Sequence, residues 1–180
     1  MKSVEKRKEL INDFEEIIQD LIINEKVLKM QEFNQHYNTT CFEHCHNVAF
    51  YSYIICRKLN LDYISASRAG MLHDLFLYNW RNSRKTIPLD GYHAFVHPKI
   101  ALKNAMDQFN LNEKEQDIIL KHMWPLTIRL PRYIESYIVS FVDKYCAILE
   151  SRNYYIEWLR SKKIYKYAYI FLTMFFFRIF

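Results

Sequence analysis

The sequence predicts an all-α protein, a single-domain helical bundle that extends over residues 1–180. The chain contains only 2 Gly and 4 Pro, and so few turn-forming residues favour long helices with short connections over a many-stranded sheet. Apolar residues recur at three- and four-residue spacings along most of the chain, which is typical of amphipathic helices. No internal repeat or low-complexity linker divides the chain, and its length suits one domain with a real core.

The first half of the sequence predicts four helices. The first is amphipathic, because its apolar residues repeat at helical spacing: Leu10, Ile11, Phe14, Ile17, Ile18, Leu21 and Ile22. A short second helix is expected around residues 27–33. The third begins in "TTCFEHCHNVAFYSYIICRKL", with Thr39 or Thr40 as its cap. Asp62 is expected to cap a fourth helix that runs to His73.

A loop should separate the two halves. The stretch "NWRNSRKTIPLDGYHAFVHP" holds one of the 2 Gly and two of the 4 Pro, which is typical of irregular structure. Pro98 suits the first turn of the next helix, which is expected to reach Phe109. Asn112 and Glu115 have the spacing of a capping box, so they open a helix that ends near His122.

Two further helices are expected after Pro125. Pro131 opens a long helix that passes through Asp143 to about Glu150. An apolar helix follows over about residues 154–180. Its charge-free run from Tyr167 to Phe177 is about eleven residues, whereas a transmembrane helix needs roughly twenty, so no membrane span is expected. This helix should pack into the core or into a homodimer interface, with contact to a membrane surface as the alternative.

Composition and charge narrow the classes of partner. The formal net charge of +5 fits an anionic ligand but is too small to imply nucleic acid binding. The 4 Cys form no CxxC pair, which favours free thiols in a reducing cytosol. The N-terminal stretch is charged throughout, unlike a signal peptide. We therefore expect a cytoplasmic protein.

Several histidines and aspartates lie within or beside apolar stretches of helices that are far apart in sequence. They are His44, His73, Asp74, His97, His122 and Asp143. A buried imidazole or carboxylate without a partner costs several kcal/mol, about 2–7, and convergence on one or two divalent metals would satisfy all of them together. Mn, Fe, Zn, Ni and Mg accept such a ligand set. Taken singly, each residue is more simply a histidine bonded to a backbone carbonyl or a surface carboxylate.

The order of these residues resembles the HD-domain superfamily of metal-dependent phosphohydrolases. "EHCHNVA" is similar to the family's first-histidine helix, and its register selects His44 over His46. "AGMLHD" is similar to the approach to the His–Asp pair, and "VDKYCAILE" to the helix of the last aspartate. The resemblance covers about residues 40–150.

The resemblance implies a helical bundle whose metal ligands line a central pocket. His44, His73, Asp74 and Asp143 would hold the first metal. His97 and His122 match two additional histidines of subfamilies with two metals, such as the hydrolase that splits diadenosine tetraphosphate symmetrically, in which Asp74 would bridge the metals. With one metal, these two histidines would contact substrate or transfer protons.

The function implied is a metal-dependent phosphohydrolase that cleaves an ester or anhydride of a nucleotide-like or small phosphorylated substrate. A metal-activated water would attack phosphorus, with Asp74, His97 and His122 as the catalytic residues. Two alternatives stay open. One is a metal-stabilised nucleotide-binding module without turnover, and the other is a di-iron oxygenase.

Substrate contacts are less defined, because many family members carry Lys three residues after the HD aspartate and this chain has Leu77 there. Arginine and lysine side chains suit phosphate oxygens. The candidates are Arg81, Arg84 and Lys85 in the loop, with Arg81 first, and Lys144 and Lys121 beside predicted ligands. His93 and His46 could orient a ligand or lie on the surface.

Overall fold

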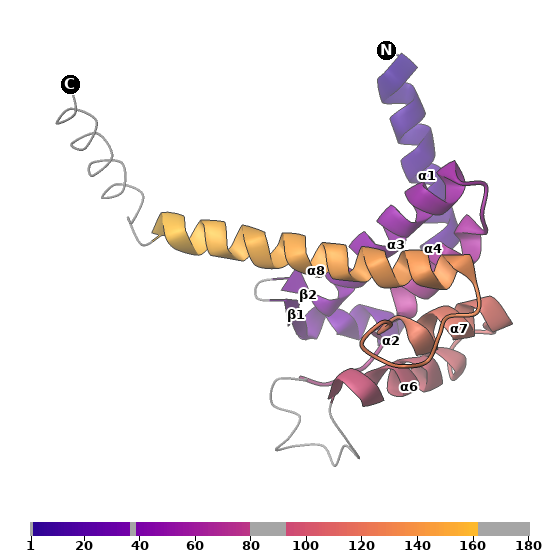
Figure 1. Cartoon of the computed structure of the whole chain (residues 1–180). Coiled ribbons are helices and arrows are strands. Elements are labelled where there is room, and N and C mark those ends of the chain that lie inside the picture. The colour runs from indigo at the N-terminus through magenta and orange to yellow at the C-terminus, as the bar shows by residue number, and fades with distance from the viewer. Residues whose placement is uncertain (1, 37–38, 80–92, 162–180) are drawn as a thin grey trace.

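A computed structural model describes residues 2–36, 39–79 and 93–161, and this part of the chain is mainly helical. It contains one small hairpin beside the helices (Figure 1). The elements are α1 (Lys2–Ile22), α2 (Glu25–Leu28), the 3-10 helix η1 (Lys29–Glu32), β1 (Asn34–His36), β2 (Thr39–Thr40), α3 (Cys41–Lys58), α4 (Tyr63–Leu72), α6 (His93–Met106), α7 (Glu113–Lys121) and α8 (Ile134–Ser161). The predicted all-α class is confirmed.

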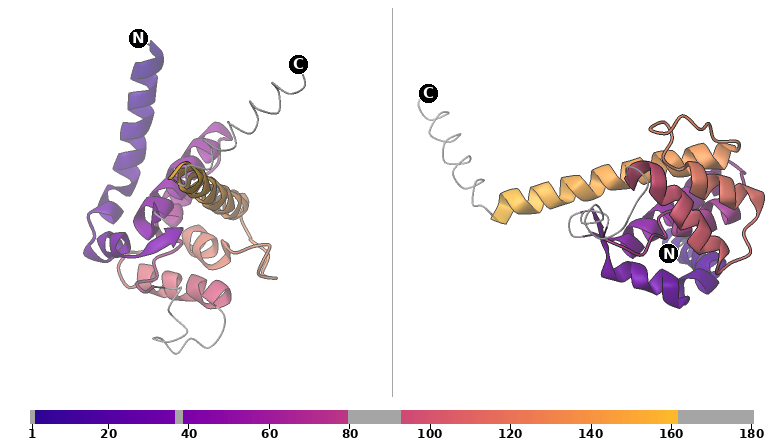
Figure 2. Two further views of the ribbon diagram at one scale, coloured as in Figure 1. Left: turned by 90° about the vertical axis from the view of Figure 1, so that its left-hand side faces the viewer. Right: turned by 90° about the horizontal axis from the view of Figure 1, so that it is seen from below.

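Helices α3 and α4 form the centre of the bundle and make the most extensive helix–helix contact in the described part. α8 crosses α3, and its last turns extend beyond the other helices (Figures 1 and 2). α1 packs against α4, and α7 contacts α4, α6 and α8. Phe14, Tyr53, Leu72, Ile118 and Val139 are fully buried between these helices, so one core joins all the long elements.

Side-chain caps begin three of the helices as the sequence predicts. Thr40 caps α3 and forms a capping box with Glu43. The Asp62 carboxylate accepts a hydrogen bond from the Ser65 backbone N–H at 3.0 Å, at the start of α4. Asn112 opens α7 with a second capping box. Each cap satisfies backbone N–H groups that have no partner within the helix.

The expected bounds of α6 and α8 were wrong. α6 begins at His93, so Pro98 lies inside the helix rather than in its first turn, and costs it one backbone hydrogen bond. α8 begins at Ile134, three residues after Pro131, and continues past Glu150 to Ser161 because no Gly or Pro interrupts it. The rest of the predicted apolar helix, 162–180, lies outside the described residues. No described helix is long and apolar enough to cross a membrane.

The hairpin between η1 and α3 was not predicted. β1 and β2 pair antiparallel, with Asn34 opposite Thr40 and His36 opposite Thr39. Strands of three and two residues are too short to display an alternating pattern. The hairpin matters for the site, because it carries Gln35 into contact with Asp74.

A close contact between α3 and α4 sets the distance between the first two predicted ligands. A Cβ atom added to Gly70 would lie 2.9 Å from the Ala49 Cα and 3.2 Å from its nitrogen. This position therefore requires glycine, although glycine lowers helix propensity. The two helices bring the rings of His44 and His73 to a centroid distance of 5.5 Å.

We expect Gly70→Ala to lower the free energy of unfolding by about 1–2 kcal/mol, because overpacking at Ala49 outweighs the gain of about 1 kcal/mol in helix propensity. Urea denaturation measures the change. Ile64→Ala, at a half-exposed position of the same helix, is the control and should change stability by less than about 1 kcal/mol. A Gly70→Ala variant as stable as the wild type would contradict the close contact.

Candidate metal centre

Five helices or helix ends bring the predicted ligands together. His44 lies in α3, His73 and Asp74 follow α4, and His97 lies in α6. The other two are His122, which follows α7, and Asp143 in α8. All six are buried, with at most 9 % of the residue exposed. Residues that span a hundred positions in sequence therefore meet in one cluster in the interior.

Backbone carbonyls fix three of the histidine rings. The Nδ1–H groups of His73, His97 and His122 donate to the carbonyl oxygens of Gly70, His93 and Ile119, each at 2.8 Å. A neutral imidazole that donates through Nδ1 keeps its lone pair on Nε2. Each Nε2 atom faces the cluster, where it can serve as a metal ligand.

The ligand atoms form two adjoining groups. In the first, the Asp143 Oδ1 lies 3.1 Å from His44 Nε2 and 3.7 Å from His73 Nε2. In the second, the Asp74 Oδ1 lies 3.2 Å from His97 Nε2 and 3.5 Å from His122 Nε2. Ligands about 2.0–2.2 Å from one metal lie roughly 3–3.5 Å from each other. These separations therefore fit metal coordination with little movement.

Unsatisfied polar atoms are the strongest indication that a cation belongs here. Among the described residues, the buried His73 Nε2 and Asp74 Oδ1 have no hydrogen-bond partner. Two Nε2 atoms, those of His97 and His122, face each other at 2.8 Å although both rings donate through Nδ1. An unpaired buried polar atom costs about 1–3 kcal/mol. A metal ion would satisfy both lone pairs and the carboxylate, so the residues fit such a group.

The close packing of carboxylates and imidazoles shifts the pKa values of the cluster. Burial alone would raise the pKa of Asp74, but the imidazoles of His73, His97 and His122 hold it below its usual range. Hydrogen bonds from His44 and His73 likewise outweigh burial and lower the pKa of Asp143. Burial, with the nearby His97, lowers the pKa of His122 to about 3. Despite burial, the carboxylates of Asp143 and Glu150 raise the pKa of His44, and the pKa of His73 is raised as well, so a metal ion would have to displace protons from these two imidazoles.

Comparison with protein-family models gives a match to the HD domain over residues 41–148, more than half of the chain. The chain belongs to the HD domain family. All six clustered residues lie within the matched span. No curated protein and no solved structure matched the chain. That the chain belongs to the HD subfamily that includes the two-metal hydrolase of diadenosine tetraphosphate therefore stays a prediction.

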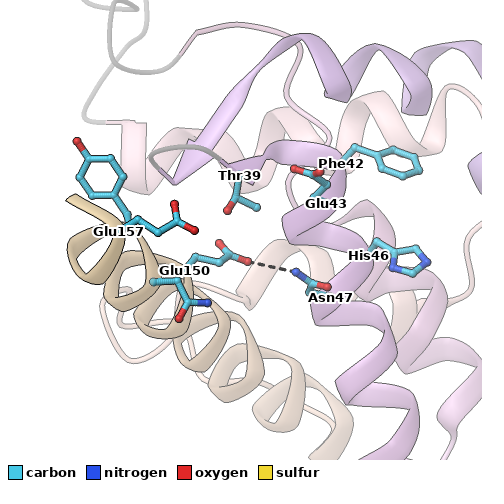
Figure 3. A pocket seen from close by; sticks show the side chains of 9 residues that line it. Thr39, Phe42, Glu43, His46, Asn47, Glu150 and Glu157 are labelled. Atoms are coloured by element: carbon cyan, nitrogen blue, oxygen red, sulfur yellow. Dashed lines mark hydrogen bonds between the residues drawn. The ribbon is translucent and has the colours of Figure 1, made fainter. Parts of the chain in front are cut away.

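Glu150 joins the HD-domain cluster from beyond the matched span. Its carboxylate accepts a hydrogen bond from His44 Nδ1, with its two oxygens at 3.0 and 3.2 Å. Asn47 Nδ2 donates to the same carboxylate at 3.5 Å (Figure 3). The sequence contained a signal for this contact, because Asp143 and Glu150 are seven residues apart and share one face of α8. A carboxylate behind a metal-binding histidine orients the ring.

Gln35 is a second residue that the sequence analysis missed. It is buried, and its side-chain Nε2 donates a hydrogen bond to Asp74 Oδ2. Its Oε1 has no hydrogen-bond partner among the described residues. Gln35 precedes the span matched by the HD-domain model, and no local pattern around it distinguishes it from an ordinary surface residue.

Of the lysines and arginines predicted to contact substrate, Lys144 is the described one that lies beside the cluster of candidate ligands. Lys144 is half-buried beside it, and its Nζ lies 3.7 Å from Asp143 Oδ2 and donates to the His122 carbonyl at 2.9 Å. Lys121 instead forms an ion pair with Asp117. The loop candidates lie outside the described residues: Arg81, Arg84 and Lys85.

Of the two histidines predicted to orient a ligand or lie on the surface, His93 lies beside the cluster and His46 lies away from it. His93 stacks on His97 with ring centroids 4.5 Å apart, and its Nδ1 lies 3.0 Å from the Tyr78 hydroxyl. His46 is partly exposed and lies 3.4 Å from a Glu15 oxygen, away from the cluster. The geometry therefore brings His44 into the cluster and leaves His46 outside it, as the sequence register indicates.

We expect Glu150→Ala to weaken Mn²⁺ binding by roughly 10–100-fold, because His44 loses the acceptor that fixes its ring. Calorimetric titration of the metal-free protein measures this. The matched control is Glu157→Ala, two turns further along α8. Glu157 and Glu150 both line a pocket between α3 and α8, separate from the cluster of candidate ligands (Figure 3). Equal metal affinity in Glu150→Ala and Glu157→Ala would contradict an orienting role for Glu150.

The low pKa of His122 predicts acid sensitivity of the metal-free protein. Between pH 6.5 and about 3 the unfolded state binds a proton at His122 that the folded state does not, so stability falls as the pH falls. Relative to His122→Gln, the wild-type free energy of unfolding should decrease by up to about 1.4 kcal/mol per pH unit. Urea denaturation with chelator present at several pH values tests this, and parallel curves for the two proteins would contradict it.

Proposed function

We propose that the protein is a metal-dependent phosphohydrolase that cleaves an ester or anhydride bond of a small phosphorylated or nucleotide-like substrate. The observation that carries the proposal is the convergence of buried histidine Nε2 atoms on two carboxylates within an HD domain. His73 Nε2 and Asp74 Oδ1 make no hydrogen bond among the described residues, although imidazole and carboxylate atoms lie 3.2–3.7 Å from them. This arrangement supports a cation between them rather than a hydrogen-bonded polar core.

We infer that the cluster holds one or two divalent metals. His44, His73 and Asp143 form one candidate group, and His73, Asp74 and His122 form another. His97 lies close enough to join the second group, and Asp74, in contact with both groups, is the candidate bridge. When bound, a divalent metal polarises phosphoryl oxygens and lowers the pKa of a water molecule toward neutrality. Mn, Fe, Ni, Zn and Mg are compatible with these ligands.

Several side chains of the protein would then act on the substrate. Lys144 places a positive charge at the cavity wall next to Asp143, and three hydrogen bonds hold its ammonium in position. Charge at that point favours an anionic phosphoryl group. With only one metal bound, the Nε2 atoms of His97 and His122 would be available for substrate contact or for proton transfer. Arg81, Arg84 and Lys85 are proposed as further phosphate contacts on sequence grounds.

Metal analysis and a phosphate-release assay test the proposed function. Protein purified without chelator should contain one or two divalent ions per chain, and His73→Ala should lose metal while His46→Ala, outside the cluster, retains it. Metal-loaded protein should release phosphate from at least one phosphorylated substrate. Asp74→Asn should lower this rate by about a hundredfold or more, because it removes the charge of the bridging carboxylate.

Other outcomes would support the alternative functions. Tight nucleotide binding without product would indicate a binding module, and bound iron with oxygen consumption would indicate an oxygenase. A protein that binds no metal, even after addition of Mn²⁺ or Ni²⁺, would overturn the hydrolase proposal.

A further inference from the structure

A cavity of about 710 Å³ opens onto the cluster of candidate ligands, and its lining combines polar and apolar residues. The polar residues are Gln35, Asp74, His93, His97, His122, Asp143 and Lys144. We propose that the apolar residues bind an apolar or aromatic group of the substrate, so that the preferred substrate carries one phosphoryl group on an apolar group rather than a polyphosphate chain. This inference rests on the proposed phosphohydrolase function and names its substrate class.

The apolar side of the cavity is formed by segments from three parts of the bundle. Ala94 belongs to α6 and Ala147 to α8, while Met123, Pro125 and Leu126 lie in the connection after α7. Since this connection begins directly after His122, the apolar wall starts beside the cluster of candidate ligands. A substrate whose phosphoryl group lies at the cluster would therefore place its attached group against this wall.

The apolar part of the described lining is poorly suited to a polyphosphate. Among the described residues that line the cavity, Lys144 is the one lysine or arginine, and it lies beside the candidate ligand Asp143. Each additional phosphate would need its own cation or hydrogen-bond donors to leave water. The apolar wall offers neither, whereas it would gain free energy from burying a ring or an alkyl group.

The cavity has the composition of a small-molecule site. Its volume lies within the roughly 300–1,000 Å³ of ligand pockets, which combine apolar walls with a few polar groups that fix orientation. The buried Gln35 Oε1, which has no partner among the described residues, is one polar group without another assigned role. Asp74 and the histidines would fix the phosphoryl end, so the apolar wall would decide which attached group is accepted.

Binding of phosphonates to the metal-loaded protein tests the proposal without requiring turnover. By isothermal titration calorimetry, phenylphosphonate should bind at least about tenfold more tightly than methylphosphonate, because only the phenyl ring reaches the apolar wall. 4-Sulfophenylphosphonate has the same ring with one more negative charge, and should bind at least about tenfold more weakly than phenylphosphonate. Equal affinity for the phenyl and methyl compounds, or tighter binding of the sulfonated compound, would overturn the proposal.

Uncharged substitutions with matched controls test whether the preference for the phenyl compound arises in this cavity. Leu126→Ser should reduce the phenyl-to-methyl affinity ratio at least about threefold, whereas Ile128→Ser, at a fully exposed position of the same connection, should retain it. Ala147→Phe should narrow the cavity and lower phenylphosphonate affinity, while Ile148→Phe, on the exposed side of α8, should not. An unchanged phenyl-to-methyl ratio in Leu126→Ser, or an unchanged phenylphosphonate affinity in Ala147→Phe, would contradict the assignment of this wall.

Together, the binding and hydrolysis experiments distinguish failure of the proposed substrate class from failure of the hydrolase function. If phenylphosphonate binds selectively but no phosphomonoester is hydrolysed, the hydrolase proposal fails and the apolar site stands. If phosphate is released but the phenyl ring adds no affinity, the hydrolase proposal stands and the substrate class proposed here is wrong.

Discussion

The hydrogen bonds at the Nδ1 atoms of the buried histidines are the constraint on which the site depends. His73 and His122 end α4 and α7, and their Nδ1–H groups donate to the carbonyls of Gly70 and Ile119, three residues earlier. Carbonyls in the last turn of a helix lack a backbone partner within it. The same bond therefore completes the helix end and directs Nε2 into the cluster. The position of a candidate metal ligand is thus determined by helix termination.

The cluster creates a cost that the rest of the fold must offset. Buried carboxylates and imidazoles lie close together, and some of their polar atoms have no partner among the described residues. The core that surrounds them is tightly packed, and the contact of Gly70 with Ala49 brings α3 and α4 close enough for His44 to approach His73. A metal ion bound by such a preformed but unsatisfied cluster would contribute to folding stability.

Residues outside the matched HD span complete the surroundings of the ligands. Gln35 reaches Asp74 from the hairpin, and Glu150 supports His44 from the later part of α8. Both therefore contact ligands directly, on different sides of the cluster. The apolar wall after α7, by contrast, lies within the matched span, and it is the feature we connect with substrate specificity.

The sequence by itself determined the helical class, the caps at Thr40, Asp62 and Asn112, and the set of polar residues placed among apolar ones. These features are local, because capping and helical periodicity depend on residues within a few positions of each other. The tertiary structure alone decided that Gln35 meets Asp74 and that the cavity beside the cluster has an apolar wall. Those properties arise from contacts between segments far apart in the chain, and local spacing carries no information about such contacts.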